Sequence, residues 1–243
     1  MPLKIVDGIL IALAVVFGGG SVLLLAAGGS HAFTDFRWSE RDLLLWDAFI
    51  SLLFFVQHSG MVRKPFRAWL GRSVPQEYHG ALYSVASGIT LTLVVVLWQR
   101  SGVMLWAAEG VARMLLLGCT LLALALFVWS ALSIHSFDIL GIAPLRARLR
   151  GRVFAHGPFE VRGPYRWMRH PLYSGVLLVL WANPVLTADR LLFNVLWSAW
   201  VVGATYLEER DLLHEFGAQY AEYQQHVPML LPLRSPWPPT SGR

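Results

Sequence analysis

Residues able to bind a charged ligand crowd into one short stretch of the sequence and one later pair. The stretch covers residues 163–175, GPYRWMRHPLYSG, and supplies arginine and histidine donors, aromatic rings and rigid prolines. The pair, Glu208 and Glu209, supplies negative charge. Donors, aromatic faces and carboxylates together suit a ligand that carries both a cation and a carboxylate. The candidate binding residues are Tyr165, Arg169, His170, Pro171, Tyr173, Glu208 and Glu209.

S-adenosylmethionine is a ligand of this kind. Its sulfonium and ammonium groups favour carboxylates and aromatic faces, and its own carboxylate favours arginine or free N–H groups. We therefore treat it as the candidate cofactor. A plainer interpretation stays open, in which Arg166 and Arg169 anchor the chain at lipid headgroups, His170 begins a helix, and the two glutamates pair with nearby arginines.

The elements that must position these residues are apolar helices. Of the 243 residues, 56% are hydrophobic and 14% are charged, and the mean hydropathy is +0.51. Apolar stretches of about 18 or more residues are typical of membrane spans, so the sequence predicts an all-α, polytopic transmembrane helical bundle of about six spans. Residues 43–56 are short for a span, which leaves five spans and a re-entrant segment as the alternative. The apolar blocks are 3–25, 43–56, 81–98, 111–134, 172–185 and 191–207.

Loop charges predict how these helices are oriented. Arginine and lysine dominate the loops at 57–80 and 135–171, whereas basic and acidic residues nearly balance in the loops at 26–42, 99–110 and 186–190. Basic loops stay on the cytoplasmic side of a membrane. We therefore expect an integral protein of a bacterial inner membrane with cytoplasmic N- and C-termini. The same loops account for the net charge of +5, so we expect no nucleic-acid partner.

The last two apolar blocks predict a helical hairpin, because only residues 187–190 join them. The hairpin would bring the stretch at 163–175 close to the paired glutamates. Beyond the membrane, apolar residues recur at helical spacing from Leu212 to Tyr223. This pattern predicts a C-terminal helix that packs against the basic loop.

Two other classes of protein fit the sequence poorly. Cys119 is the only cysteine, and no two of the eight histidines lie three or four residues apart, as convergence on a metal from one helix requires. We therefore expect no metal ion. A transporter component would place charges or broken helices at the middle of the membrane, whereas the polar residues here collect at one boundary.

The ordered set of motifs resembles the signature of the isoprenylcysteine carboxyl methyltransferase superfamily of integral membrane methyltransferases. The likeness covers roughly residues 155–232, with GPYRxxRHPxYxG followed by the paired glutamates and by FGxxYxxY at 216–223. It implies S-adenosylmethionine bound between two elements and facing the cytosol. One is the loop of residues 163–171, which ends in Arg169-His170-Pro171 and is called the Arg-His-Pro loop below, and the other is the helix that carries the glutamates. Residues 1–134 would then be N-terminal transmembrane helices, and residues 135–243 the loop, hairpin and C-terminal helix of a cofactor-binding methyltransferase region.

A narrower likeness points to the methanethiol S-methyltransferase branch. It rests on QHS at 57–59, FDILG at 137–141, EERDL at 208–212 and VPMLLP at 227–232. That branch methylates a small thiol and forms dimethyl sulfide, so the resemblance implies a small thiol and membrane lipid as partners. The VPMLLP tail stands where the isoprenylcysteine branch has a more basic ending. A lipid-linked or isoprenylcysteine-like substrate is therefore the alternative.

Three further residues are candidates for handling the proton of a thiol, which has a pKa of about 8.5 and is mostly protonated at neutral pH. His58 and His135 each close an apolar segment at the inner boundary. Each is either a catalytic base or orienting group, or a hydrogen-bonded interface residue. Asp138 could orient such a histidine, although capping of the loop is the simpler role.

Overall fold

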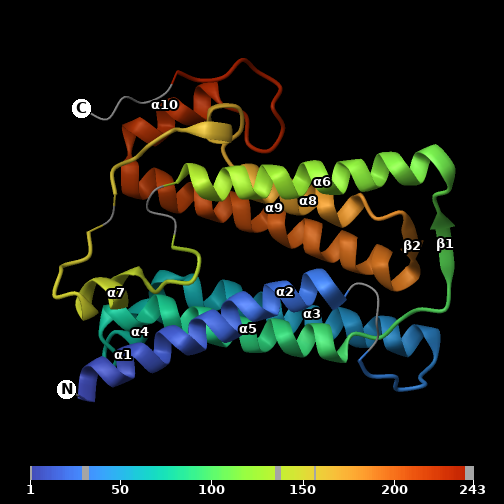
Figure 1. Ribbon diagram of the computed structural model, residues 1–243, viewed down its shortest axis with the longest axis horizontal. Helices are drawn as coiled ribbons and strands as arrows, with labels where there is room; N and C mark the ends of the chain where they lie inside the picture. Colours follow the sequence, from blue (N-terminus) through green and yellow to red (C-terminus); the bar gives the residue numbers. More distant parts are fainter. Residues whose placement is uncertain (1, 29–32, 135–137, 156, 239–243) are drawn as a thin grey trace. The chain divides into compact units, whose positions relative to one another are not determined.

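The chain folds into two compact units, each of them mainly helical (Figure 1). The first unit consists of the described parts of Met1–Gly102 and Asp138–Ala155, and the second of the described parts of Val103–Phe137 and His156–Arg243. The predicted all-α membrane bundle is confirmed. This computed structural model describes residues 2–28, 33–134, 138–155 and 157–238.

The first unit is built on long apolar helices that pack against α5 (His79–Leu97). α1 (Pro2–Leu13), the π-helical segment η1 (Ala14–Gly19) and α2 (Gly20–Gly28) follow one another directly, and α5 packs against all three and against α3 (Glu40–Val62). A Cβ atom at Gly88 of α5 would lie 2.2 Å from the carbonyl oxygen of Phe17. Glycine therefore lets the backbones of η1 and α5 touch.

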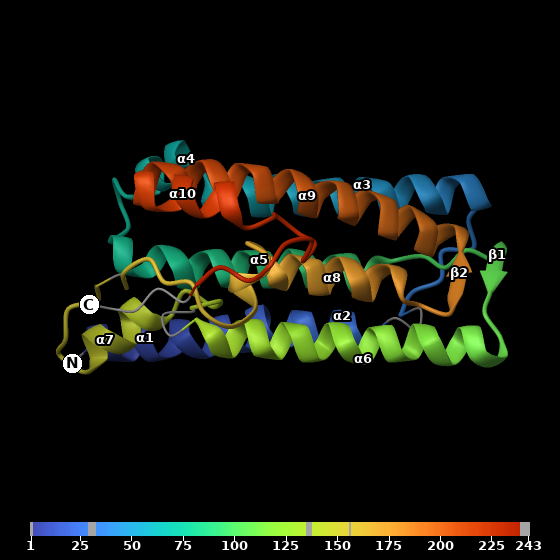
Figure 2. The ribbon, with the colours of Figure 1, turned by 90° about the horizontal axis from the view of Figure 1, so that it is seen from above.

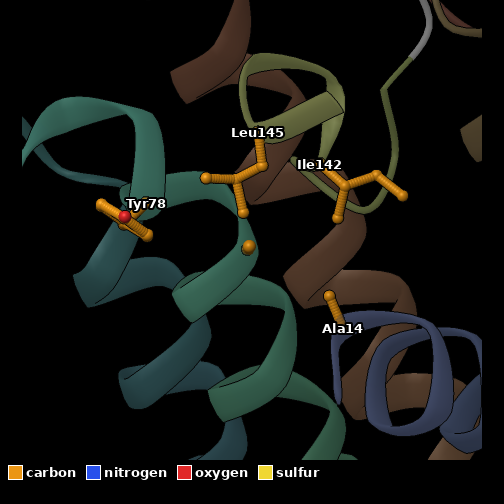
Figure 3. Packing of buried hydrophobic residues seen from close by; sticks show 5 residues of the cluster. Ala14, Tyr78, Ile142 and Leu145 are labelled. Atoms are coloured by element: carbon orange, nitrogen blue, oxygen red, sulfur yellow. The ribbon is translucent and has the colours of Figure 1, made fainter. Parts of the chain in front are cut away.

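Short helices gather at one end of the first unit. α4 (Lys64–Leu70) follows α3, and η2 (Gln76–Tyr78) leads into α5. α7 (Ala143–Leu149) packs against α1 and η2. Figure 3 shows Ile142 and Leu145 turned toward Ala14 and Tyr78, with which they form a buried cluster.

The second unit places a short helix, α8 (Pro171–Trp181), along α6 (Gly110–Ser133) and α9 (Ala188–Phe216) (Figure 2). The end of α8 leads into the strand β2 (Val185–Thr187), which pairs antiparallel with β1 (Met104–Ala107) ahead of α6. The predicted hairpin is present as α8, β2 and α9. After α9 comes α10 (Ala218–His226), which packs back on α9.

Five helical stretches of the described chain are long and apolar enough to cross a membrane. The chain is therefore an integral membrane protein by the length and composition of its helices. Residues 43–56, predicted to be short, are the middle of the 23-residue α3, because Ser39 caps its start and the helix runs on through 57–62. The short segment is α8, with 11 residues, because Pro171 opens it and Pro184 follows its end. The spans are Lys4–Leu25, Glu40–Val62, Gln76–Leu97, Gly110–Ser133 and Ala188–Phe216.

The sequence predicts a division of the chain into N-terminal transmembrane helices (1–134) and a cofactor-binding region (135–243). This division stays a prediction.

Candidate functional site

The loop before α8 is fixed in place by the tail of the chain. The N–H of Arg169 donates to the carbonyl of Pro228 (2.9 Å), and the N–H of His170 donates to that of Met229 (3.0 Å). The hydroxyl of Ser174 donates to the carbonyl of Leu230 (2.6 Å). The VPMLLP tail and the Arg-His-Pro loop, some 60 residues apart in the sequence, thus form one structure.

Arg169, His170 and Glu209 form a buried charged network at the centre of this structure. Glu209 Oε1 lies 2.5 Å from Arg169 Nε and 3.1 Å from His170 Nε2, and the Gln224 amide donates to Glu209 Oε2 (3.1 Å). Arg169 Nη1 donates to the carbonyls of Gln224 (3.1 Å) and Val227. The side chains of Arg169 and Glu209 are 10% and 9% exposed. The Nε and Nη1 donors of Arg169 are therefore used within the protein.

Glu208, next in the chain to Glu209, has different surroundings. The Tyr173 hydroxyl donates to Glu208 Oε2 (2.6 Å), and the Tyr173 ring stacks on the His170 ring, with centroids 5.6 Å apart and planes 8° apart. Burial, and then the negative charge of Glu208, raise the pKa of Tyr165. Glu208 is half-buried and lies near two neutral phenol rings, an arrangement that suits a cation.

A cluster of aromatic side chains supports this face from α10. Tyr220 and Tyr223 pack with Phe159, Val161 and Val227, and the Tyr223 hydroxyl donates to the carbonyl of Tyr165 (2.6 Å). Burial raises the pKa of both α10 tyrosines, so their hydroxyls stay protonated at neutral pH. The Tyr220 hydroxyl is buried near the Arg169 guanidinium, without an aligned hydrogen bond to any described residue.

Two of the candidate proton-handling residues, His58 and Asp138, belong to the first unit. His58 lies in the first unit, where its Nε2 is 2.5 Å from the Tyr83 hydroxyl and its ring is 5.0 Å from that of Phe54. The two carboxylate oxygens of Asp138 accept the N–H groups of Ile142 (3.0 Å) and Ala143 (2.7 Å) at the start of α7. Asp138 therefore ties the loop to the start of α7, whose N-cap residue Ile142 makes no side-chain capping bond. His135 lies outside the described residues.

Several members of the cluster could not be chosen from the sequence. Gln224 belongs to no motif. Val227, Pro228 and Met229 take part through their backbone carbonyls, and because every residue has one, their residue types give no signal. The spacing FGxxYxxY was the one available signal for α10, and it does place Tyr220 and Tyr223 inward.

Within the described residues, no group of three or more metal-ligating side chains could hold a metal ion.

Comparison with known proteins gives a family and a set of relatives. Residues 48–230 match the family model described as NnrU protein. The chain belongs to the NnrU protein family. The match includes His58, the Arg-His-Pro loop, both glutamates and most of the tail that holds the loop. No solved structure matches this NnrU family member significantly.

Three relatives show what this NnrU family member is similar to. A methanethiol S-methyltransferase of Pseudomonas sp. (strain GM41(2012)) is 35% identical over 201 residues, 82% of this chain and 76% of the relative. A methanethiol S-methyltransferase of Mycobacterium tuberculosis (strain ATCC 25618 / H37Rv) is 33% identical over 187 residues, 76% of this chain and 75% of the relative. Nurim of Rattus norvegicus is 30% identical over 185 residues, 70% of this chain and 68% of the relative. The resemblance to the methanethiol S-methyltransferase branch is confirmed.

Proposed function

We propose that this protein is a membrane methyltransferase that transfers a methyl group from S-adenosylmethionine to a small thiol such as methanethiol. The product is a thioether, dimethyl sulfide in that case. The likeness to methanethiol S-methyltransferases over about four fifths of the chain supports the thiol. The observation that supports S-adenosylmethionine as the methyl donor is the position of Glu208. Its carboxylate is half-buried and lies beside two neutral phenol rings.

The residues present fit S-adenosylmethionine. When bound, this cofactor would supply a methyl group on a positively charged sulfur. A thiolate would attack the methyl carbon, the bond from that carbon to the charged sulfur would break, and neutral S-adenosylhomocysteine would leave. Glu208 would balance the positive charge, and the rings of Tyr165 and Tyr173 would lie against it. The buried Tyr220 hydroxyl lies near the Arg169 guanidinium and could also meet a polar group of the cofactor. Arg169, His170, Pro171 and Glu209 would hold the loop in its shape.

The thiol must lose its proton in the reaction, because a thiolate is the nucleophile. His58 is the candidate to accept it, with Tyr83 orienting the imidazole through their hydrogen bond. We expect His58→Gln to lower the rate of thiol methylation by about a hundredfold or more and to leave the affinity for S-adenosylmethionine unchanged. Equal rates for His58→Gln and the wild type would exclude a base at this position. His135 and Asp138 remain weaker candidates, and the hydrogen bonds from two backbone N–H groups to Asp138 favour a structural role for it.

The charge of the loops supports an orientation in which the cofactor site faces the cytosol, where S-adenosylmethionine is made. Both termini would then be cytoplasmic, in the inner membrane of a bacterium. A small apolar thiol and its thioether product would enter and leave through the lipid-facing side of the bundle. The proposal requires neither a metal ion nor nucleic acid.

A substrate comparison tests the proposal. Detergent-purified protein is supplied with S-adenosylmethionine and either methanethiol or a farnesylated cysteine, and both products are measured. We expect methylation of methanethiol and little or none of the prenylcysteine. Preferential methylation of the prenylcysteine would reverse the choice of substrate and leave the chemistry in place.

A further inference from the structure

α7 is a docked helix and not a loose basic loop. Leu145 is fully buried and Ile142 is 3% exposed in the cluster that they form with Ala14 and Tyr78 (Figure 3). The carboxylate of Asp138 accepts hydrogen bonds from the N–H groups of Ile142 and Ala143 at the start of the helix. These contacts hold the helix in one orientation on the first unit.

One arginine of α7 strengthens this docking. Arg148 Nε lies 3.5 Å from Asp7 Oδ2, and its guanidinium lies over the Tyr78 ring, 5.3 Å from the centroid. The Tyr78 hydroxyl donates to Asp7 Oδ1 (2.7 Å), and Asp7 is 1% exposed. The charge of Arg148 is therefore used inside the unit.

The other three arginines between residues 146 and 152 do not take part in the docking of α7. Arg146, Arg150 and Arg152 are exposed, and none of them forms an ion pair with any residue in the parts of the chain that the structure describes. Val153, directly after them, is 96% exposed. α7 ends at Leu149, and the N–H of Arg152 donates to the carbonyl of Ala147 (2.9 Å), which ties the residues after the helix to it.

The position of α7 along the membrane helices indicates what these side chains meet. Asp7 lies in the first turn of the span Lys4–Leu25, and Tyr78 lies in the first turn of the span Gln76–Leu97. Arg148 contacts both residues. α7 therefore lies beside the ends of two spans, at the height of the boundary between membrane and water.

We propose that residues 146–153 form a binding surface for the headgroups of anionic phospholipids. Guanidinium groups match phosphate oxygens in charge and in bidentate geometry, and clusters of basic residues next to spans favour anionic lipids. Val153 would enter the apolar edge of the lipid layer, which free phosphate or a nucleic acid does not offer. The docking of α7 fixes the arginines before lipid arrives, which lowers the entropy lost on binding.

Lipid binding by the full chain in detergent, followed by native mass spectrometry, tests the proposal independently of methyl transfer. Phosphatidylglycerol, phosphatidylcholine and inorganic phosphate are titrated in separate arms. We expect the wild type to retain phosphatidylglycerol in preference to phosphatidylcholine. The triple variant Arg146→Gln, Arg150→Gln, Arg152→Gln should lose about a hundredfold in affinity for phosphatidylglycerol.

Two controls keep the result specific. The triple variant Arg41→Gln, Arg100→Gln, Arg113→Gln removes the same charge from three exposed arginines elsewhere and should bind phosphatidylglycerol like the wild type. Val153→Ser should weaken binding while leaving every charge in place. Equal retention of the two lipids, an equal loss in both triple variants, or competition by millimolar inorganic phosphate would each overturn the assignment to a lipid surface.

Discussion

Glu208 and Glu209 are adjacent residues of one helix and have separate roles in this account. Successive side chains of an α-helix point about 100° apart, so one carboxylate can enter the interior while the next stays at the surface. Glu209 points to the buried Arg169 and His170, and Glu208 to the Tyr173 hydroxyl. The sequence showed that two carboxylates were present but could not show this division between them.

Replacement of Glu208 tests its assignment to the cofactor. Glu208→Gln should weaken S-adenosylmethionine binding about 30-fold to several thousand-fold, because the loss of a charged contact to a desolvated ligand costs about 2–5 kcal/mol. S-adenosylhomocysteine, which lacks the sulfonium charge, should lose less affinity. Calorimetry with both ligands makes the comparison. Unchanged affinity for both would leave Glu208 with a structural role only.

Replacement of Arg169 should act mainly on stability. Arg169→Ala leaves Glu209 buried without its strongest partner, and breaking a buried ion pair in this way costs about 3–5 kcal/mol. Arg162→Ala is the matched control, since Arg162 pairs with Glu160 near the surface and such pairs contribute about 0–1 kcal/mol. Melting temperatures in detergent measure both. Equal melting temperatures for the two variants would contradict the network described here.

Element by element, the sequence predicted most of the second unit. The four residues between the last two apolar blocks predicted the hairpin. Helical spacing predicted one helix from Leu212 to Tyr223, which the structure divides at Gly217 into the end of α9 and α10. The length of α8 was overestimated because apolar residues continue to Val185 past the helix end at Trp181. The role of the tail could not be predicted, because its contacts to Arg169 and His170 are made by backbone carbonyls.

The packing of the Arg-His-Pro loop on α6 depends on one glycine. Gly163 has φ +53°, and a Cβ atom there would lie 2.0 Å from Ser133 Oγ. Gly163→Ala should therefore destabilise the protein by about 1–3 kcal/mol. Gly118→Ala in α6, where a Cβ atom would meet nothing within 4 Å, should instead stabilise it by up to about 1 kcal/mol. Thermal unfolding of the pair checks the sign of each change, and a stabilised Gly163→Ala variant would refute the close contact.

At the level of the whole molecule, loop charge predicts the orientation in the membrane. Cys119→Ser provides a background without cysteine, into which Arg150→Cys or Arg100→Cys is introduced. A membrane-impermeant maleimide added to intact spheroplasts should label the cysteine at position 100 and not that at position 150. Labelling at position 150 in sealed cells would place the basic loops outside the cell. The cofactor site would then face away from the cytosol, where S-adenosylmethionine is made.

The proposed reaction transfers a methyl group from S-adenosylmethionine to a small thiol. The most direct test incubates the purified protein with methanethiol and S-adenosylmethionine that carries a trideuterated methyl group, and analyses the vapour by mass spectrometry. We expect dimethyl sulfide with one trideuterated methyl group, formed in proportion to the protein added. Absence of this product, while the protein stays folded and both reactants are saturating, would contradict it.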